Sequence, residues 1–129
     1  MARFTLSTRS LARLEGVHPD LVRVVHRAIE LNELGFIVTE GLRTIVRQQQ
    51  LVAAGASTTL HSRHLTGHAV DLAALVGGQV RWDWPLYARL NAVVQRAAVD
   101  CGVVVEWGGN WTEFKDGPHF QLPHGIYPA

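Results

Sequence analysis

The spacing of hydrophobic positions along the chain predicts four helices. Apolar residues recur at helical spacing behind Pro19 and again behind Pro85, and proline is tolerated in the first turn of a helix. Two shorter helices are indicated by hydroxyl residues suited to cap them, Ser7 and Thr44. A glycine lies close to the point where each pattern stops. The predicted helices span 7–14, 18–35, 44–55 and 83–102.

Short apolar or alternating runs between these helices predict strands at 36–39, 69–72, 103–105 and 119–122. Residues 75–82 predict a hairpin that turns at Gly77-Gly78. This order favours an α+β fold in which a small, mostly antiparallel sheet is flanked by helices. No repeat, low-complexity tract or linker interrupts the pattern, so residues 1–129 are expected to form one domain.

Composition narrows the class of protein. With 47% hydrophobic and 18% charged residues the chain is an ordinary globular protein rather than a disordered one. The net charge of +1 is too small to argue for a nucleic-acid partner. The lone cysteine, Cys101, cannot form an internal disulfide, so folding is not expected to depend on oxidation. Its apolar neighbours indicate a buried structural thiol.

The first residues carry no apolar run of the kind found in a signal peptide, and no stretch is long enough to cross a bilayer. We therefore expect the protein to be made and held in the cytoplasm, without inserting into the membrane. If its substrate is the cell wall, a separate protein must let it out.

Candidate chemistry is concentrated in the stretch from Ser62 to Leu72. His64 and Asp71 are seven positions apart with Gly67 between them, which suits a turn that runs into a strand. An imidazole nitrogen and a carboxylate oxygen are two of the three protein ligands of a catalytic zinc. A third is available at His119, and Asp116 places a carboxylate three residues before it.

A histidine and an aspartate in one loop are also commonly a hydrogen-bonded pair or solvated side chains. Two observations favour the metal site. His61 and His68 crowd the same segment as His64, and the segment around His119 also combines a histidine with an acid. From residue types alone both interpretations stay open.

The motif Ser62-x-His64-x-x-Gly67-x-Ala69-x-Asp71, with the acid-x-x-His of Asp116 to His119, resembles a zinc peptidase family. That family includes D-alanyl-D-alanine carboxypeptidases, D,D-dipeptidases and phage L-alanyl-D-glutamate endopeptidases. The stretch 40–44, Glu-Gly-Leu-Arg-Thr, resembles the arginine turn of the family, and 106–111, Glu-Trp-Gly-Gly-Asn-Trp, resembles its phage endolysins. The resemblance covers roughly the whole chain.

The resemblance implies a role for each site residue. Zinc (Zn²⁺) would be bound by His64, Asp71 and His119 at one face of the sheet, with a fourth position left for water. Asp116 would act as general base, and Arg43 would stabilise charge on the scissile carbonyl. In addition, Ser62 would bind the substrate backbone and Trp111 would contact substrate. From the residues alone, Ser62 also fits a plain turn, and Trp107 and Trp111 fit either the wall of a groove or the core.

The identity of the base is the point where the chain departs from many relatives, which carry glutamate where this chain has Asp116. Glu106 and Glu113 lie in the same segment and are competing candidates. We favour Asp116 because a Gly-Pro turn can fold its carboxylate back toward the ion. Glu106 is expected to end a buried strand and to hold a structural hydrogen bond.

The function implied is that of a phage-type endolysin, expected to be a monomer, which cuts peptidoglycan stem peptides, with the bond between L-alanine and D-glutamate as the expected site of cleavage. Within the class, the alternative is a D-alanyl-D-alanine carboxypeptidase or dipeptidase. From another class, the alternative is a non-catalytic wall-binding module of the same fold.

Overall fold

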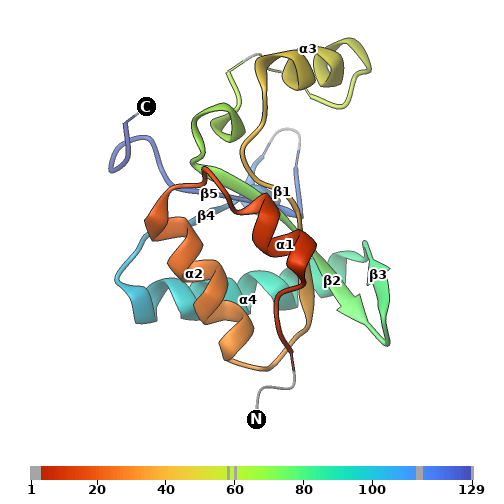
Figure 1. The fold of residues 1–129 in the computed structure, drawn as a ribbon, viewed down its shortest axis with the longest axis vertical. Helices are drawn as coiled ribbons and strands as arrows, with labels where there is room; N and C mark the ends of the chain where they lie inside the picture. The colour runs from red at the N-terminus through yellow and green to blue at the C-terminus, as the bar shows by residue number, and fades with distance from the viewer. Residues whose placement is uncertain (1–3, 58, 60, 113–114, 129) are drawn as a thin grey trace.

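The computed structural model describes residues 4–57, 59, 61–112 and 115–128. Its elements follow the order α1 (Thr8–Arg13), α2 (Pro19–Glu30), β1 (Phe36–Glu40), α3 (Ile45–Ala53), η1 (Arg63–Thr66, a 3-10 turn), β2 (Ala69–Val76), β3 (Gln79–Arg81), α4 (Trp84–Cys101), β4 (Glu106–Trp107), η2 (Gly108–Asn110) and β5 (His119–Gln121). The α+β class predicted from the pattern is confirmed (Figure 1).

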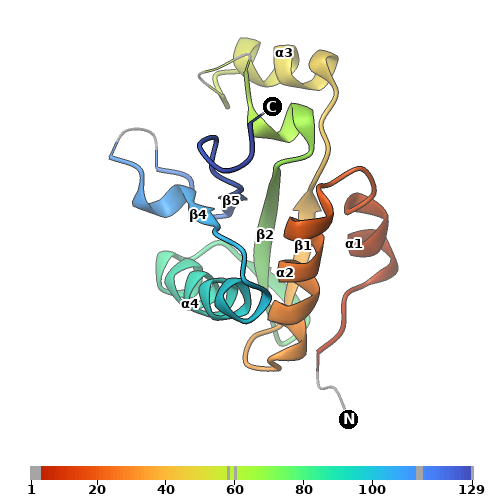
Figure 2. The ribbon, with the colours of Figure 1, turned by 90° about the vertical axis from the view of Figure 1, so that its left-hand side faces the viewer.

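The sheet is antiparallel throughout and its strands lie in the order β1-β2-β5-β4. Strand β2 is the longest strand. It is also central, because it pairs with β1 along one edge and with both β3 and β5 along the other. The predicted hairpin at Gly77-Gly78 joins β2 to β3. Helices α2 and α4 pack together and supply much of the hydrophobic core beneath the sheet (Figure 2).

Most helix boundaries agree with the predicted caps. The hydroxyls of Ser7 and Thr44 accept backbone N–H bonds at the starts of α1 and α3. Asp83 occupies the N-cap position of α4, but its carboxylate makes no cap bond and pairs with Arg81 instead. Among residues that the structure describes, no helix combines the length and apolar character needed to cross a bilayer.

Two predictions about the elements were wrong: where α2 ends, and the strand expected at 103–105. Helix α2 ends at Glu30 rather than near Gly35, since Asn32 adopts a left-handed conformation (φ 60°) that a helix cannot continue through. The run 103–105 is not a strand. Val103 and Val105 are buried, but pairing with β5 begins only at Glu106. Cys101 is half-buried and packs against the core, short of the full burial expected.

Helix α3 lies apart from this core, beyond the end of the sheet where η1 and the C-terminal tail also gather (Figures 1 and 2). The segments that carry the candidate motif therefore meet at one end of the sheet.

Candidate active site

Sheet register brings three polar side chains together. Asp71 on β2 is the direct partner of Glu40 on β1 and of His119 on β5. The register shifts between Val38 and Glu40, where Thr39 is the extra residue of a β-bulge and donates its hydroxyl to the Asp71 carbonyl (3.2 Å). The carboxylate of Asp71 is thus flanked from both neighbouring strands.

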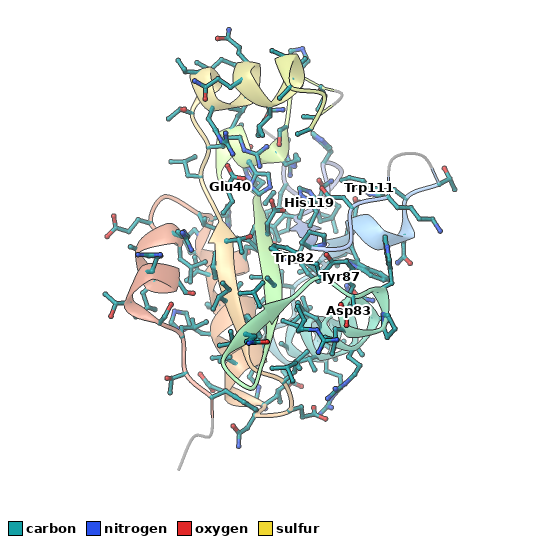
Figure 3. All side chains as sticks on the ribbon, turned by 90° about the vertical axis from the view of Figure 1, so that its right-hand side faces the viewer. Glu40, Trp82, Asp83, Tyr87, Trp111 and His119 are labelled. Carbon is teal, nitrogen blue, oxygen red and sulfur yellow. The ribbon has the colours of Figure 1, made fainter. Side chains whose placement is uncertain are left out.

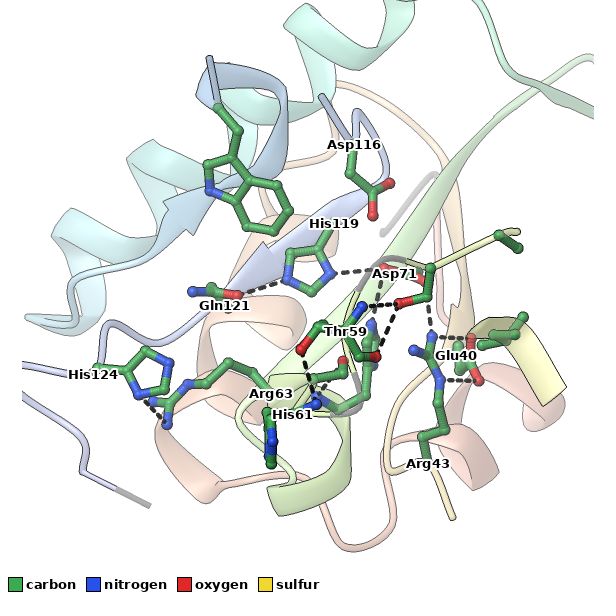
Figure 4. Close-up of a pocket in the computed structure, with 16 residues that line it drawn as sticks. Glu40, Arg43, Thr59, His61, Arg63, Asp71, Asp116, His119, Gln121 and His124 are labelled. Atoms are coloured by element: carbon green, nitrogen blue, oxygen red, sulfur yellow. Dashed lines mark hydrogen bonds and ion pairs between the residues drawn. The ribbon is translucent and has the colours of Figure 1, made fainter. Parts of the chain in front are cut away.

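His64 reaches the same point from η1. The Ser62 hydroxyl accepts the His64 backbone N–H and begins this turn, and Gly67 ends it in a left-handed conformation (φ 76°). A side chain at Gly67 would also collide with the carbonyl of Gly16. The His64 ring donates from Nδ1 to the carbonyl of Gly41 (2.8 Å), which leaves Nε2 facing Asp71 Oδ1 at 3.1 Å (Figure 4).

His119 completes the cluster. Its Nδ1 lies 3.3 Å from Asp71 Oδ1 and its Nε2 lies 2.8 Å from Gln121 Oε1. The predicted alternation of His119 and Gln121 on one side of the last strand is confirmed. One ligand atom from each of His64, Asp71 and His119 lies within 4.8 Å of the other two.

This donor set can hold a metal ion. Each histidine turns one nitrogen toward Asp71 and gives the other to an oxygen acceptor, which is how protein histidines are oriented for a metal. Burial alone would raise the pKa of Asp71, but hydrogen bonds from His119 and His64 outweigh it and hold that pKa well below its usual range. The carboxylate is therefore ionised and available as a ligand.

Asp116 lies beside His119 at the mouth of the cluster (Figure 4). Its backbone N–H donates to Gly108 (3.0 Å) and its carbonyl accepts from the His119 N–H (3.2 Å), so the loop is tied to η2 and to β5. Burial, and then the negative charge of Asp71, raise the pKa of Asp116 above its ordinary value. A carboxylate with a raised pKa accepts a proton more readily.

Arg43 also reaches the cluster, but it is held more firmly than the sequence suggested. Its side chain is only 8% exposed, and Nη2 lies 3.8 Å from Asp71 Oδ2. The guanidinium donates to both oxygens of Glu40 (2.7 and 2.5 Å) and to Gln48 Oε1 (2.7 Å). These bonds use three of its five N–H groups, so donors remain for a substrate oxygen.

A cavity of about 380 Å³ surrounds the cluster and is also lined by Ser62, Trp111 and His124. The ring centroids of Trp111 and His119 are 5.0 Å apart, and the two residues lie next to each other in Figure 3. Trp107 instead packs against the hydrophobic core and donates its indole N–H to the Gly117 carbonyl (2.7 Å). Of the two tryptophans, one therefore borders the cavity and the other is structural.

Several residues that shape the site were missed from the sequence. Glu40 and Gln48 fix Arg43, and Gln121 binds His119. Arg63 is buried and its guanidinium donates to the carbonyls of Leu122 and Tyr127, which ties the C-terminal tail to η1. Only Gln121 carried a sequence signal, its alternation with His119. Glu113, a rival for the base, lies outside the described residues.

Comparison with known proteins agrees with this site. Residues 1–122 match the family described as phage L-alanyl-D-glutamate peptidase, and the chain belongs to that family. It is 29% identical to the L-alanyl-D-glutamate peptidase of Escherichia phage T5, over 96% of this chain and 93% of that protein. It is 32% identical to the enzyme of the same name from Listeria phage A118, over 93% of this chain but only 43% of that protein.

A solved structure of an L-Ala D-Glu endopeptidase also resembles this chain. The crystal structure of the L-Ala D-Glu endopeptidase ChiX from Serratia marcescens matches with a TM-score of 0.92 and 52% sequence identity. The match covers 99% of this chain and 96% of that chain. The predicted family, that of the phage L-alanyl-D-glutamate endopeptidases, is confirmed.

Proposed function

We propose that the protein is a zinc-dependent endopeptidase that hydrolyses the L-alanyl-D-glutamyl bond of peptidoglycan stem peptides. The observation that carries this is the meeting of His64, Asp71 and His119 at one point of the cavity, with Asp116 beside them. The names of the phage relatives and of ChiX supply the substrate. Residues 1–129 would act as one catalytic domain and as a monomer.

Zinc suits this site better than a hard cation does. Two imidazole nitrogens and one carboxylate oxygen are a donor set typical of catalytic zinc, whereas magnesium and calcium prefer oxygen ligands. When bound, the ion would act as a Lewis acid that polarises the peptide carbonyl and makes water acidic enough to attack near neutral pH.

Asp116 would transfer the proton. Its carboxylate would accept the proton of the attacking water and then deliver it to the amine that leaves when the peptide bond breaks. The partial burial of Asp116 and its raised pKa favour the first half of this transfer, and the leaving amine is basic enough to take the proton in the second half. The backbone of Asp116 is hydrogen-bonded to Gly108 and to His119, so the main chain that carries the carboxylate is fixed before substrate arrives.

Arg43, Ser62 and Trp111 would position the peptide. The remaining N–H groups of Arg43 would donate to the oxygen of the scissile carbonyl, whose negative charge grows as water attacks. The Ser62 hydroxyl accepts the His64 N–H and can still donate its own hydrogen to the substrate backbone. The ring of Trp111 would form one wall of the groove.

In a phage infection such an enzyme would accumulate in the host cytoplasm, reach the wall through a separate membrane-permeabilising protein, and lead to lysis. Neither nucleic acid nor membrane insertion is part of this proposal.

The test is to incubate the protein with purified peptidoglycan and to identify the new amino termini by mass spectrometry. A new amino-terminal glutamate is the expected result. Release of free D-alanine would instead indicate a D-alanyl-D-alanine carboxypeptidase. Binding to the wall without any new terminus would indicate a non-catalytic module.

A further inference from the structure

A second groove adjoins the active-site cavity at Trp111. It has a volume of about 400 Å³ and lies where α4 meets β4 and η2 (Figure 2). Trp111 lines both hollows, and its ring centroid is 5.0 Å from that of His119. We call this hollow the side groove, and its polar and aromatic lining consists of Asn91, Gln95, Glu106, Trp107, Asn110 and Trp111. The side groove is therefore continuous with the place where the scissile peptide would lie.

Two amide side chains on α4 are held in fixed orientations in this lining. The backbone carbonyl of Val105 only accepts hydrogen bonds, so Gln95 must turn its Nε2 toward it (3.1 Å). The same Nε2 donates to Asn91 Oδ1 (3.1 Å), which fixes the orientation of the second amide. Across the described residues, neither Asn91 Nδ2 nor Gln95 Oε1 has a hydrogen-bond partner in the protein. The lining thus offers a donor next to an acceptor.

Aromatic rings and low charge characterise the rest of the lining. Trp107 and Trp111 are half-buried, so each leaves part of its indole to solvent. The face of an indole carries partial negative charge and attracts the C–H groups of a sugar ring, as it attracts the edge of an aromatic ring. Of the lining residues in the described part of the chain, only Glu106 ionises, and its negative charge disfavours an anionic ligand. Such a lining suits a neutral sugar.

The expected substrate supplies a neutral sugar at a suitable distance. In peptidoglycan the amino group of L-alanine is acylated by the lactyl group of N-acetylmuramic acid. L-alanine and the lactyl group are each about as long as one residue, so the sugar ring begins about 7 Å from the scissile carbonyl. Its acetamido group has one N–H donor and one C=O acceptor, which match Gln95 Oε1 and Asn91 Nδ2. The stem peptide beyond the cleaved bond instead carries carboxylates, which Glu106 would repel.

We propose that the side groove binds the N-acetylmuramic acid ring to which the cleaved peptide is attached. Asn91 donates to the acetyl carbonyl, Gln95 accepts from the acetamido N–H, and Trp111 stacks on the sugar at the border with the active site. This inference rests on the proposed function for the identity of the substrate. It deepens that function, because the enzyme would recognise the glycan as well as the peptide.

The central experiment compares three substrates that share one stem tripeptide. The first carries N-acetylmuramic acid on L-alanine, the second carries the same sugar with a hydroxyl in place of the acetamido group, and the third carries a simple acetyl group. All three have the same charge and the same scissile bond. We expect kcat/KM to fall about tenfold from the first to the second substrate, and about a hundredfold from the first to the third.

Asn91→Asp tests the contact directly. The new carboxylate still accepts from Gln95 but can no longer donate to an acetyl carbonyl. This variant should lose about tenfold on the first substrate and stay within about twofold of wild type on the other two, because its effect and the loss of the acetamido group concern the same contact. Gln49→Glu is the matched control, since it adds the same charge at an exposed position outside the side groove. Thermal unfolding checks the fold of both variants, and the wild-type comparison of substrates decides the question if Asn91→Asp does not fold.

Binding of a sugar that cannot be cut separates this inference from the proposed function. The methylamide of N-acetylmuramic acid is neutral and contains no L-alanyl bond. Its titration is followed through the indole N–H signals in ¹H–¹⁵N NMR spectra. We expect the signal of Trp111 to shift in wild type, with weaker binding in Asn91→Asp, while the exposed Trp82 outside the side groove stays unchanged. If the sugar binds in this way but no peptide is cut, the side groove stands and the proposed activity fails.

Equal kcat/KM on all three substrates would overturn the inference and leave the proposed activity intact. The same loss on all three substrates in Asn91→Asp would also overturn it, because Asn91 would then act only through the structure. A shift of Trp82 without one of Trp111 would place the sugar elsewhere. A loss in Asn91→Asp that depended on the length of the peptide beyond D-glutamate would assign the side groove to the peptide instead.

Discussion

Asp71 and His119 are direct partners across the β2–β5 pair, with Asp71 Oδ1 3.3 Å from His119 Nδ1. A one-residue slip of β5 would turn His119 to the opposite face, where Phe120 is now buried in the core. The hydrophobic core therefore fixes the geometry of the candidate ligands, and the site should survive changes in the surrounding loops better than changes in the register.

The first prediction concerns the ligands. His119→Ala or His64→Ala should abolish both bound zinc and activity, because two protein ligands hold zinc poorly. Elemental analysis of the purified protein measures the zinc, and a strong chelator should inactivate wild type reversibly. The control is His124→Ala, which alters a residue of the same cavity outside the three-residue cluster. Full zinc content in His119→Ala would show that this ligand is misassigned.

Much of this fold and site could be predicted from the sequence. Helical spacing and capping hydroxyls located the helices, and the motif with its distant partner identified His64, Asp71 and His119 as a group. These features succeed because they depend on local chemistry: a cap bonds its own helix, and ligand types reflect what a metal accepts.

What the sequence could not show depends on register and on contacts between distant strands. The bulge at Thr39 places Glu40 beside Asp71, and only the three-dimensional pairing reveals that Glu40 holds Arg43 from the same side. The run 103–105 is apolar enough for a strand but has no partner until Glu106. Asn32 ended α2 early through a backbone conformation that residue spacing does not reveal.

The second prediction concerns Arg43. If it stabilises charge that appears only in the transition state, Arg43→Ala should lower kcat by about a hundredfold or more while zinc stays bound. Because Arg43 also pairs with Glu40 and Gln48, thermal unfolding must be measured in parallel. Arg47→Ala is the control, since Arg47 is exposed on α3.

A change confined to KM would make Arg43 a residue that binds the substrate without favouring the transition state. Normal kcat and KM with a lower unfolding temperature would leave it only the structural role of holding Glu40 and Gln48.

The third prediction concerns the base. Asp116→Asn should keep its zinc and its fold but lose roughly 10²–10⁴-fold in rate, the usual cost of a missing general base. Glu113→Gln should stay close to wild type. Glu106→Gln should also remain active. If Asp116→Asn lysed walls normally and Glu106→Gln did not, the proton-transfer role would move to Glu106.

The last prediction concerns the C-terminal tail and pH. The Tyr127 hydroxyl donates to Asp20 Oδ2 (2.7 Å) and, with Arg23, lowers the pKa of Asp20, while the same bond raises the pKa of Tyr127. A lowered carboxyl pKa gives stability that is present above the unfolded value of 3.8 and is lost as pH falls through the folded pKa. A raised phenol pKa gives stability that is present below 10.0 and is lost as pH rises through the folded pKa.

Tyr127→Phe should therefore lower the free energy of unfolding by a nearly constant amount between about pH 5 and 9, with the deficit shrinking on either side. The deficit should be about 1 kcal/mol or less, because Asp20 is partly exposed and water competes for the bond. Urea unfolding at a series of pH values measures it. Tyr87→Phe is the control at low pH. Burial rather than a carboxylate is the main cause of the raised pKa of Tyr87, so this variant tests the loss of a tyrosine hydroxyl that no carboxylate holds. A deficit for Tyr127→Phe that stays constant down to pH values well below 3.8 would show that Asp20 does not hold the tail through its charge.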